Sequence, residues 1–141
     1  MKPRIDTITL AVKDLDRALQ FYRDGLGLNT DGIIGTEFPG TDTLPAGRAA
    51  MFTLEGGTIL SLYPATELAK DAGVEPAQAT GPVFSIGHTV QTRGEVDDLL
   101  AAAEAAGGAI VGVVGERPWG IYSGYFTDPD GHLWEVVHFL R

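Results

Sequence analysis

The feature of this sequence that most limits its fold is an order of predicted elements that occurs twice along the chain. Residues 5–12 alternate between apolar and polar or small side chains, which is typical of a half-buried strand, and residues 83–91 are also predicted to form a strand. A helix follows each of these strands and ends at glycines, such as Gly27 in the first half and Gly107 in the second. Three more strands follow in each half. The sequence therefore predicts two copies of a β-α-β-β-β unit.

The remaining elements of the two halves are separated by segments rich in proline and glycine. The additional strands are predicted over residues 32–38, 49–54, 58–63, 109–115, 121–127 and 132–140. The helices are predicted after Asp14, over residues 66–73 and over residues 95–106. Residues 39–48 form a long loop that can lie over a pocket, and residues 75–82 are predicted to be a linker. We therefore predict a single domain over residues 1–141 with modules 1–74 and 83–141.

Length and composition agree with a folded domain. The chain has 141 residues, of which 44% are hydrophobic and 21% are charged, and a disordered chain would be poorer in apolar residues. A chain of this length can bury a core without disulfides or structural metals. It contains no cysteine, which excludes disulfides, thiolate metal ligands, iron–sulfur clusters and a cysteine nucleophile.

The charge of the chain limits its partners. Ten Lys and Arg against nineteen Asp and Glu give a net charge of −9, which repels the phosphate backbone of nucleic acids and favours neutral or cationic ligands. The N-terminal residues lead directly into the first predicted strand, and no apolar stretch reaches the roughly 18 residues that a membrane span needs. We therefore expect a cytoplasmic protein with a small-molecule ligand and with neither a nucleic-acid nor a membrane partner.

Two motifs resemble those of a known family. Residues 12–22 (VKDLDRALQFY), followed by residues 26–28 (LGL), resemble the opening motif of the vicinal oxygen chelate superfamily, which includes glyoxalase I, extradiol dioxygenases and bleomycin-resistance proteins. Residues 126–135 (FTDPDGHLWE) resemble its last hairpin, in which a tight turn precedes the strand that bears the final metal carboxylate. The turn also has a local cause, because Pro129 presets φ and Gly131 can adopt positive φ.

Together with the repeat, the resemblance covers nearly the whole chain. It implies an α+β fold in which two βαβββ modules form a curled cradle of mixed sheets. In the family two modules, often from different subunits of a dimer, enclose a deep cleft, so we expect a homodimer. Whether the modules pair within one chain or between two is left open by the predicted linker.

Most of the metal ligands that the resemblance implies are missing from this chain. Alignment on the motifs places the ligand positions of the metal-dependent members at Thr7, Ser61, Ser85 and Glu135. A catalytic divalent site normally uses about three histidine or carboxylate donors, and neutral hydroxyls bind first-row metals poorly. We therefore predict no bound metal and no other cofactor, and a divalent metal would require unconventional ligands.

The histidines do not restore this site. His88 lies three residues after Ser85, so strand alternation turns it to the opposite face unless the strand has a bulge. It is either a hydrogen-bonded packing residue or a ligand contact. His132 and His138 share one face of their predicted strand and Glu135 lies on the other, which argues against a metal triad there.

Aromatic residues are the remaining candidates for ligand contact. Aromatic side chains on strands mostly belong to the core. Trp119, however, lies between a proline and a glycine at the start of a strand, where a flat side chain can stack on a ligand. The predicted ligand-contacting residues, aromatic and polar together, are Thr7, Phe38, Phe52, Ser61, Tyr63, Ser85, His88, Trp119, Tyr122 and Glu135.

Three hypotheses of function follow. In the first, the chain is a metal-free protein that binds and sequesters an aromatic or amphipathic compound such as an antibiotic, as drug-binding members of the family do. In the second, it is an enzyme of the lyase or isomerase type that uses an unconventional metal site or Glu135 as a general base. Glu135 is otherwise an unpaired residue or a hydrogen-bond acceptor for the ligand. In the third, the chain acts mainly through association.

Overall fold

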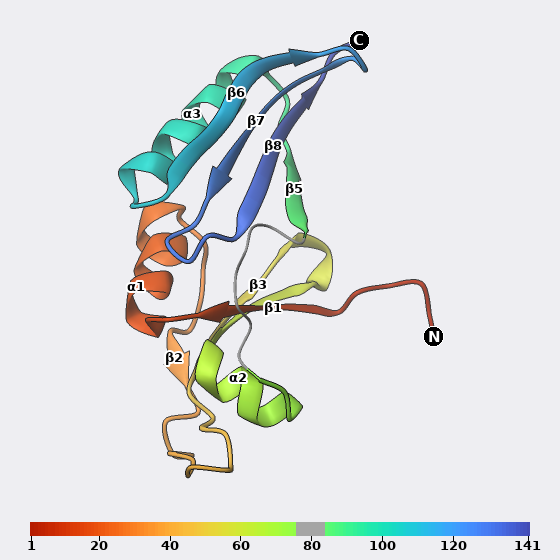
Figure 1. Cartoon of the computed structure of the whole chain (residues 1–141). Helices are drawn as coiled ribbons and strands as arrows, with labels where there is room; N and C mark the ends of the chain where they lie inside the picture. Colours follow the sequence, from red (N-terminus) through yellow and green to blue (C-terminus); the bar gives the residue numbers. More distant parts are fainter. Residues whose placement is uncertain (76–83) are drawn as a thin grey trace. The chain divides into compact units, whose positions relative to one another are not determined.

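The computed structural model describes residues 1–75 and 84–141 (Figure 1). Contacts within the chain divide it into two compact units, and each is described by itself. The predicted linker 75–82 lies outside the described residues, except for Glu75. None of the helices in the described part of the chain has both the length and the apolar character that a membrane crossing requires.

The first unit contains one four-stranded mixed sheet in the order β1-β4-β3-β2. Its elements are β1 (Thr7–Val12), α1 (Leu15–Leu19), the π-helical continuation η1 (Gln20–Gly25), β2 (Ile33–Ile34), β3 (Ala49–Thr53), the 3-10 turn η2 (Glu55–Gly57), β4 (Ile59–Pro64) and α2 (Ala65–Ala72). Strand β1 runs parallel to β4, and β3 runs antiparallel to β2 and β4.

The second unit repeats this arrangement with the order β5-β8-β7-β6. Its elements are β5 (Ser85–Thr89), α3 (Arg93–Ala105), β6 (Ala109–Arg117), β7 (Ile121–Thr127) and β8 (Leu133–Phe139). Strand β5 runs parallel to β8, and the other neighbouring pairs are antiparallel. The shared strand order confirms the predicted α+β fold with two similar βαβββ modules.

Side-chain caps fix where two of the helices begin. The carboxylate of Asp14 accepts a hydrogen bond of 3.0 Å from the backbone N–H of Arg17, as predicted for an N-cap. Thr92 and Glu95 form a reciprocal capping box at the start of α3. That box starts α3 two residues before the predicted residue 95.

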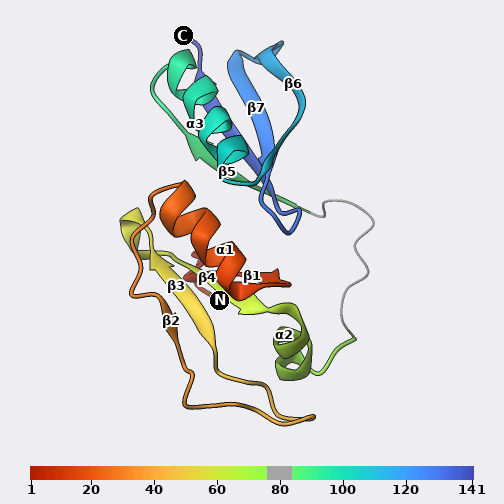
Figure 2. The same ribbon diagram turned by 90° about the vertical axis from the view of Figure 1, so that its left-hand side faces the viewer.

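A helix covers one face of each sheet and buries the apolar residues on that face. Helix α1 contacts β3 and β4, and α3 contacts β6, β7 and β8 (Figure 2). The side chains of Tyr22 and Phe52 are both fully buried in the first unit, with their ring centroids 6.0 Å apart. The prediction that Phe52 contacts a ligand is therefore corrected, because its side chain is 0% exposed and belongs to the core.

The predicted strand over residues 32–38 is much shorter in the structure, where β2 covers only Ile33–Ile34. Gly35 has φ of +75°, and a Cβ at this position would lie 2.0 Å from the carbonyl oxygen of Gly47. The N–H of Phe38 then donates to the carbonyl of Gly35, which closes a turn. The strand ends here because a non-local backbone approach, absent from any local pattern, selects the left-handed conformation at Gly35.

Candidate functional site

Within the described residues of the second unit, one face of the sheet packs against α3 and the opposite face carries no helix of that unit. The side-chain position of Gly124 on β7 faces α3. A Cβ added there would lie 2.5 Å from a methyl carbon of Leu100. Side chains alternate along a strand, so Ser123 and Tyr125 lie on the opposite face. Tyr125 pairs with Glu135 on β8, which places Glu135 on that face too. We call this surface the helix-free face of the second sheet.

Glu135 is held in a hydrogen-bonded cluster on the helix-free face. The hydroxyl of Ser123, which is 0% exposed, donates to a carboxylate oxygen of Glu135 over 2.7 Å. Tyr125 also hydrogen-bonds to this carboxylate. A carboxylate offers about four lone-pair positions, so two donors leave acceptor positions for a ligand.

Tyr125 stays protonated in this cluster and remains a donor at neutral pH. Burial raises the pKa of its hydroxyl, and the charge of Glu135 and the hydrogen bond to it raise this pKa further. The positive charge of Arg117 acts in the opposite direction and lowers the pKa of Tyr125. Since a phenol titrates near 10 even without these effects, the hydroxyl carries its proton at pH 7.

Arg117 lies on the helix-free face because it pairs with Ile121, which shares that face of β7 with Ser123 and Tyr125. The register between β6 and β7 shifts between Val111 and Gly115, and Gly112 has φ of +70° in this bulge. The guanidinium of Arg117 folds back along its own strand and donates to the carbonyl oxygens of Val113 (2.7 Å) and Gly115 (3.1 Å). The pairing places this cation on the same face as Glu135, and the bulge shifts its level along β7 by two residues.

The positions aligned with metal ligands do not fit a divalent metal. Thr7 and Ser61 lie on one face of the first sheet, and Ser85 lies on the helix-free face of the second with Glu135. This set offers three neutral hydroxyls and one carboxylate, which are poor ligands for a first-row metal. Within residues 1–75 and 84–141, no group of three or more His, Asp or Glu side chains can hold a metal ion.

The three histidines lie away from this cluster. His88 pairs with the buried Val136, which places it on the side of the sheet that faces α3. His132 Nδ1 lies 2.7 Å from a carboxylate oxygen of Asp128 in the β7–β8 turn. His138 Nδ1 lies 3.4 Å from a backbone carbonyl oxygen. The face assigned to His88 from strand alternation thus agrees with the observed register.

The other predicted aromatic contacts have different surroundings. Trp119 is 71% exposed in the turn between β6 and β7, and Phe38 is 61% exposed in the first unit. Tyr122 faces α3, where its hydroxyl donates to Asp97 over 2.8 Å and the Arg93 guanidinium lies 5.1 Å from its ring centroid. Tyr122 is therefore a packing residue of the helix face, whereas Trp119 and Phe38 are accessible.

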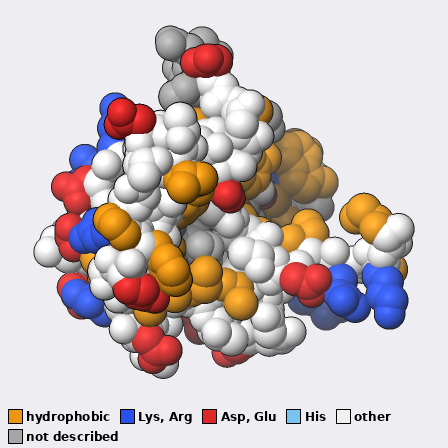
Figure 3. Space-filling view, turned by 90° about the horizontal axis from the view of Figure 1, so that it is seen from below, with side chains coloured by type: hydrophobic (Ala, Val, Ile, Leu, Met, Phe, Trp, Pro, Cys, Tyr) orange, Lys and Arg blue, Asp and Glu red, His pale blue; other side chains and the backbone are white. Residues whose placement is uncertain are grey.

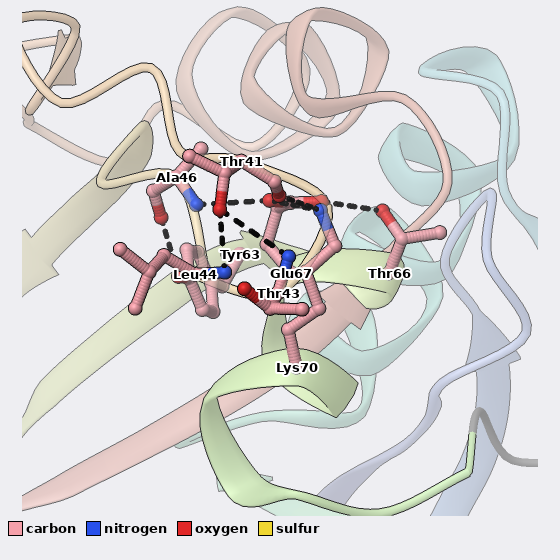
Figure 4. Close-up of polar contacts among 8 residues, drawn as sticks. All are labelled: Thr41, Thr43, Leu44, Ala46, Tyr63, Thr66, Glu67 and Lys70. Carbon is pink, nitrogen blue, oxygen red and sulfur yellow. Dashed lines mark hydrogen bonds and ion pairs between the residues drawn. The ribbon is translucent and has the colours of Figure 1, made fainter.

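The hydroxyl of Tyr63 helps to fix the loop 39–48, because it donates to the carbonyl of Ala46 (Figure 4). Glu67 on α2 accepts from the backbone N–H of Ala46 (2.8 Å) and from Lys70 Nζ (3.2 Å), and Lys70 also donates to the carbonyl of Thr41 (3.0 Å). The Glu67 side chain is only 15% exposed. These contacts join the loop to α2.

We expect Glu67→Ala to weaken the attachment of this loop by about 1–3 kcal/mol, because it leaves the Ala46 amide without its acceptor. The measurement is hydrogen exchange at the Ala46 amide, with Glu37→Ala as a control at an exposed carboxylate of the neighbouring turn.

The hydrogen bond from Ala46 lowers the pKa of Glu67 from 4.5. The attachment is therefore complete above pH 4.5 and is lost as the pH falls through the lowered pKa. Unchanged Ala46 protection in Glu67→Ala would contradict this role.

The first unit also contains a shallow hollow of about 260 Å³. It is lined by Asn29, Thr30, Asp31, Met51 and Thr53. The Thr30 hydroxyl donates to the carbonyl of Met51 over 2.6 Å, so this side chain already has a structural partner. Acidic side chains are scattered over the face of the molecule shown in Figure 3, in keeping with the net charge of −9.

Comparison with known proteins gives the following similarities. The profile described as Glyoxalase/Bleomycin resistance protein/Dioxygenase superfamily matches residues 4–136. A glyoxalase-related enzyme from Fulvimarina pelagi is 27% identical with a TM-score of 0.78, over 97% of this chain and 88% of that one. Among curated protein sequences, none matches this chain at a significant level.

Two further solved structures resemble the chain in fold. A glyoxalase/bleomycin resistance protein/dioxygenase from Nocardioides is 24% identical with a TM-score of 0.76, over 100% of this chain and 86% of that one. The fosfomycin resistance protein FosX from Listeria monocytogenes, in complex with Mn(II) and a dihydroxypropylphosphonic acid, is 20% identical with a TM-score of 0.67. That match covers 96% of this chain and 90% of FosX.

Proposed function

Because the chain belongs to the Glyoxalase/Bleomycin resistance protein/Dioxygenase superfamily, we propose that it is a metal-independent protein that binds a cationic aromatic or amphipathic compound, such as an antibiotic. The observation that carries this proposal is the cluster around Glu135. Its carboxylate is fixed by hydroxyls of Ser123 and Tyr125, while the other positions aligned with metal ligands are neutral hydroxyls. A protein that binds such a compound without converting it acts by sequestration.

The chemistry of the cluster supports a cationic ligand group. A half-buried carboxylate makes stronger hydrogen bonds to a cation than to a neutral donor, and the bonds from Ser123 and Tyr125 hold it in one orientation. The net charge of −9 also attracts a cation over longer distances. The ligand group in contact with Glu135 is therefore proposed to be an ammonium or a similar donor.

The position of Trp119 supports a ligand of drug size. Tyr125 and Ile121 are four residues apart on β7, which corresponds to roughly 13 Å along a strand. Trp119 precedes Ile121 in the adjoining turn, and its exposed ring is available for stacking. A compound that touches both Glu135 and Trp119 must span about that length.

A second candidate function is proton transfer with Glu135 as the general base. One observation favours it: two hydroxyls orient the carboxylate, and catalytic bases are commonly oriented in this way by a third group. Turnover of an added compound, lost in Glu135→Gln, would select this candidate over sequestration.

The test of the proposed function uses the purified chain and cationic aromatic compounds, starting with benzylamine and cationic antibiotics. We expect the backbone amide resonances of Ser123, Tyr125 and Glu135 to shift with benzylamine but not with benzyl alcohol, its neutral counterpart. Larger compounds should also quench fluorescence in the native chain but not in Trp119→Phe.

Elemental analysis of the same preparation, after dialysis against trace divalent metals, should find well below one transition metal per chain. About one bound metal per chain would overturn the metal-independent proposal. No resonance shift and no quenching with any compound would overturn the proposal of ligand binding.

A further inference from the structure

Arg117 has a positive charge that no acidic side chain neutralises directly. Within residues 1–75 and 84–141, Arg117 has no carboxylate within ion-pair distance, whereas Arg48 and Arg93 each have one at 3.0 Å and 2.7 Å. The guanidinium donates two hydrogen bonds to backbone carbonyls of its own strand. A guanidinium has five N–H donors in a planar fork, so these two bonds leave donors for another group.

The backward fold of the side chain and the register of β6 determine the level at which this charge lies. Arg117 pairs with Ile121, but its guanidinium reaches back to the carbonyls of Gly115 and Val113. Gly115 pairs with Ser123, so the guanidinium lies close to the level of Ser123 and Tyr125 on β7. Without the backward fold the cation would lie at the end of the strand.

Two opposite charges therefore face the same surface with β7 between them. Strands β6 and β8 are both neighbours of β7, so their backbones lie two strand spacings apart, roughly 10 Å. Arg117 extends from β6 and Glu135 from β8, and Tyr125 lies between them on β7. The Tyr125 ring is half-buried and offers an apolar surface between the two charges.

We propose that this surface recognises a zwitterion: Glu135 binds the cationic group of the ligand, Arg117 binds an anionic group such as a carboxylate, and an aromatic or apolar spacer lies over Tyr125. The proposal rests on the proposed function, in which Glu135 receives a cation. It adds an anionic group to the ligand and assigns the selection of that group to Arg117. A planar guanidinium matches the two oxygens of a carboxylate, which favours this group over a single acceptor.

The experiment compares three probes that share a benzene ring: 4-(aminomethyl)benzoate, benzylamine and benzoate. Titration followed by amide resonances gives their dissociation constants. We expect 4-(aminomethyl)benzoate to bind at least about 10-fold more tightly than benzylamine, because a hydrogen-bonded charged group contributes about 1.5–3 kcal/mol. Benzoate alone should bind more weakly than 4-(aminomethyl)benzoate.

Variants assign the preference to Arg117. In Arg117→Gln the advantage of 4-(aminomethyl)benzoate over benzylamine should disappear, because the anionic group of the ligand loses its partner. Arg93→Gln is the matched control, because Arg93 is paired with Glu116 on the helix side of the sheet. If Arg117→Gln does not fold, two measurements on the native chain still test the proposal. They are the affinities of the three probes and the salt dependence of those affinities.

The outcomes separate this inference from the proposed function. Equal affinity for 4-(aminomethyl)benzoate and benzylamine overturns the zwitterion proposal and leaves the cation-binding function standing. An advantage that persists in Arg117→Gln also overturns it. If neither amine binds, the proposed function fails together with the inference.

Discussion

Replacing Phe52 by alanine should lower the free energy of unfolding by about 3–5 kcal/mol, because it removes a fully buried aromatic ring and leaves a cavity. The ring of Phe52 packs near that of Tyr22, which is itself 0% exposed, and both lie in the core of the first unit. Urea denaturation followed by circular dichroism measures the change. A loss below about 1 kcal/mol would mean that the site relaxes around the missing ring.

Phe38→Ala is the matched control for this prediction. Phe38 belongs to the same unit and the same residue type, but 61% of it is exposed. Its replacement should therefore change the free energy of unfolding by roughly 0.5 kcal/mol or less. A large effect of Phe38→Ala together with a small effect of Phe52→Ala would contradict the burial on which the two roles depend.

The element order was predictable because it depends on local periodicity. The two β-α-β-β-β units follow from alternation in strands, helical spacing and glycine stops, and the structure confirms both units. The length of β2 was not predictable in the same way. It depends on the close approach of Gly35 to the carbonyl of Gly47, which brings together residues far apart in the loop region.

The candidate site was predictable only in part. Glu135 follows from the resemblance of the last hairpin. Ser123 and Tyr125 were missed, although alternation along β7 and the register with β8 would have placed them beside Glu135. The signal for Arg117 was weaker, because its level along β7 depends on a two-residue shift of register near Gly112 and on the backward fold of its side chain. Only strand pairing reveals this cluster.

The aromatic residues on strands show the same limit of prediction from local sequence patterns. Phe52 and Tyr122 were both predicted to contact a ligand, but alternation shows only that neighbouring residues face opposite sides. It does not say which side a helix covers. In the structure Phe52 enters the core beneath the helix, and Tyr122 bonds to Asp97 of α3. Assigning a strand residue to a binding face thus requires the position of the helix.

Glu135→Gln is the variant with the largest expected effect on binding. Glutamine keeps the shape of the side chain and an acceptor for Ser123, but it removes the negative charge that we propose binds the cationic group of the ligand. Loss of a charged hydrogen-bond partner costs about 1.5–3 kcal/mol, so the affinity for benzylamine should fall roughly 10- to 100-fold. Titration followed by amide resonances or calorimetry measures the change.

Glu116→Gln is the matched control, because Glu116 is a carboxylate of the same sheet that pairs with Arg93 on the helix side and is 58% exposed. Its replacement should leave benzylamine affinity unchanged within about 2-fold, since exposed ion pairs contribute little and this one is remote from the helix-free face. Equal weakening by both variants would indicate that the overall charge of the chain, rather than the Glu135 cluster, attracts the cation. Both variants remove one negative charge from the same sheet, but they remove it at different positions. Weakening by Glu135→Gln alone, with the fold intact, would therefore locate recognition at Glu135.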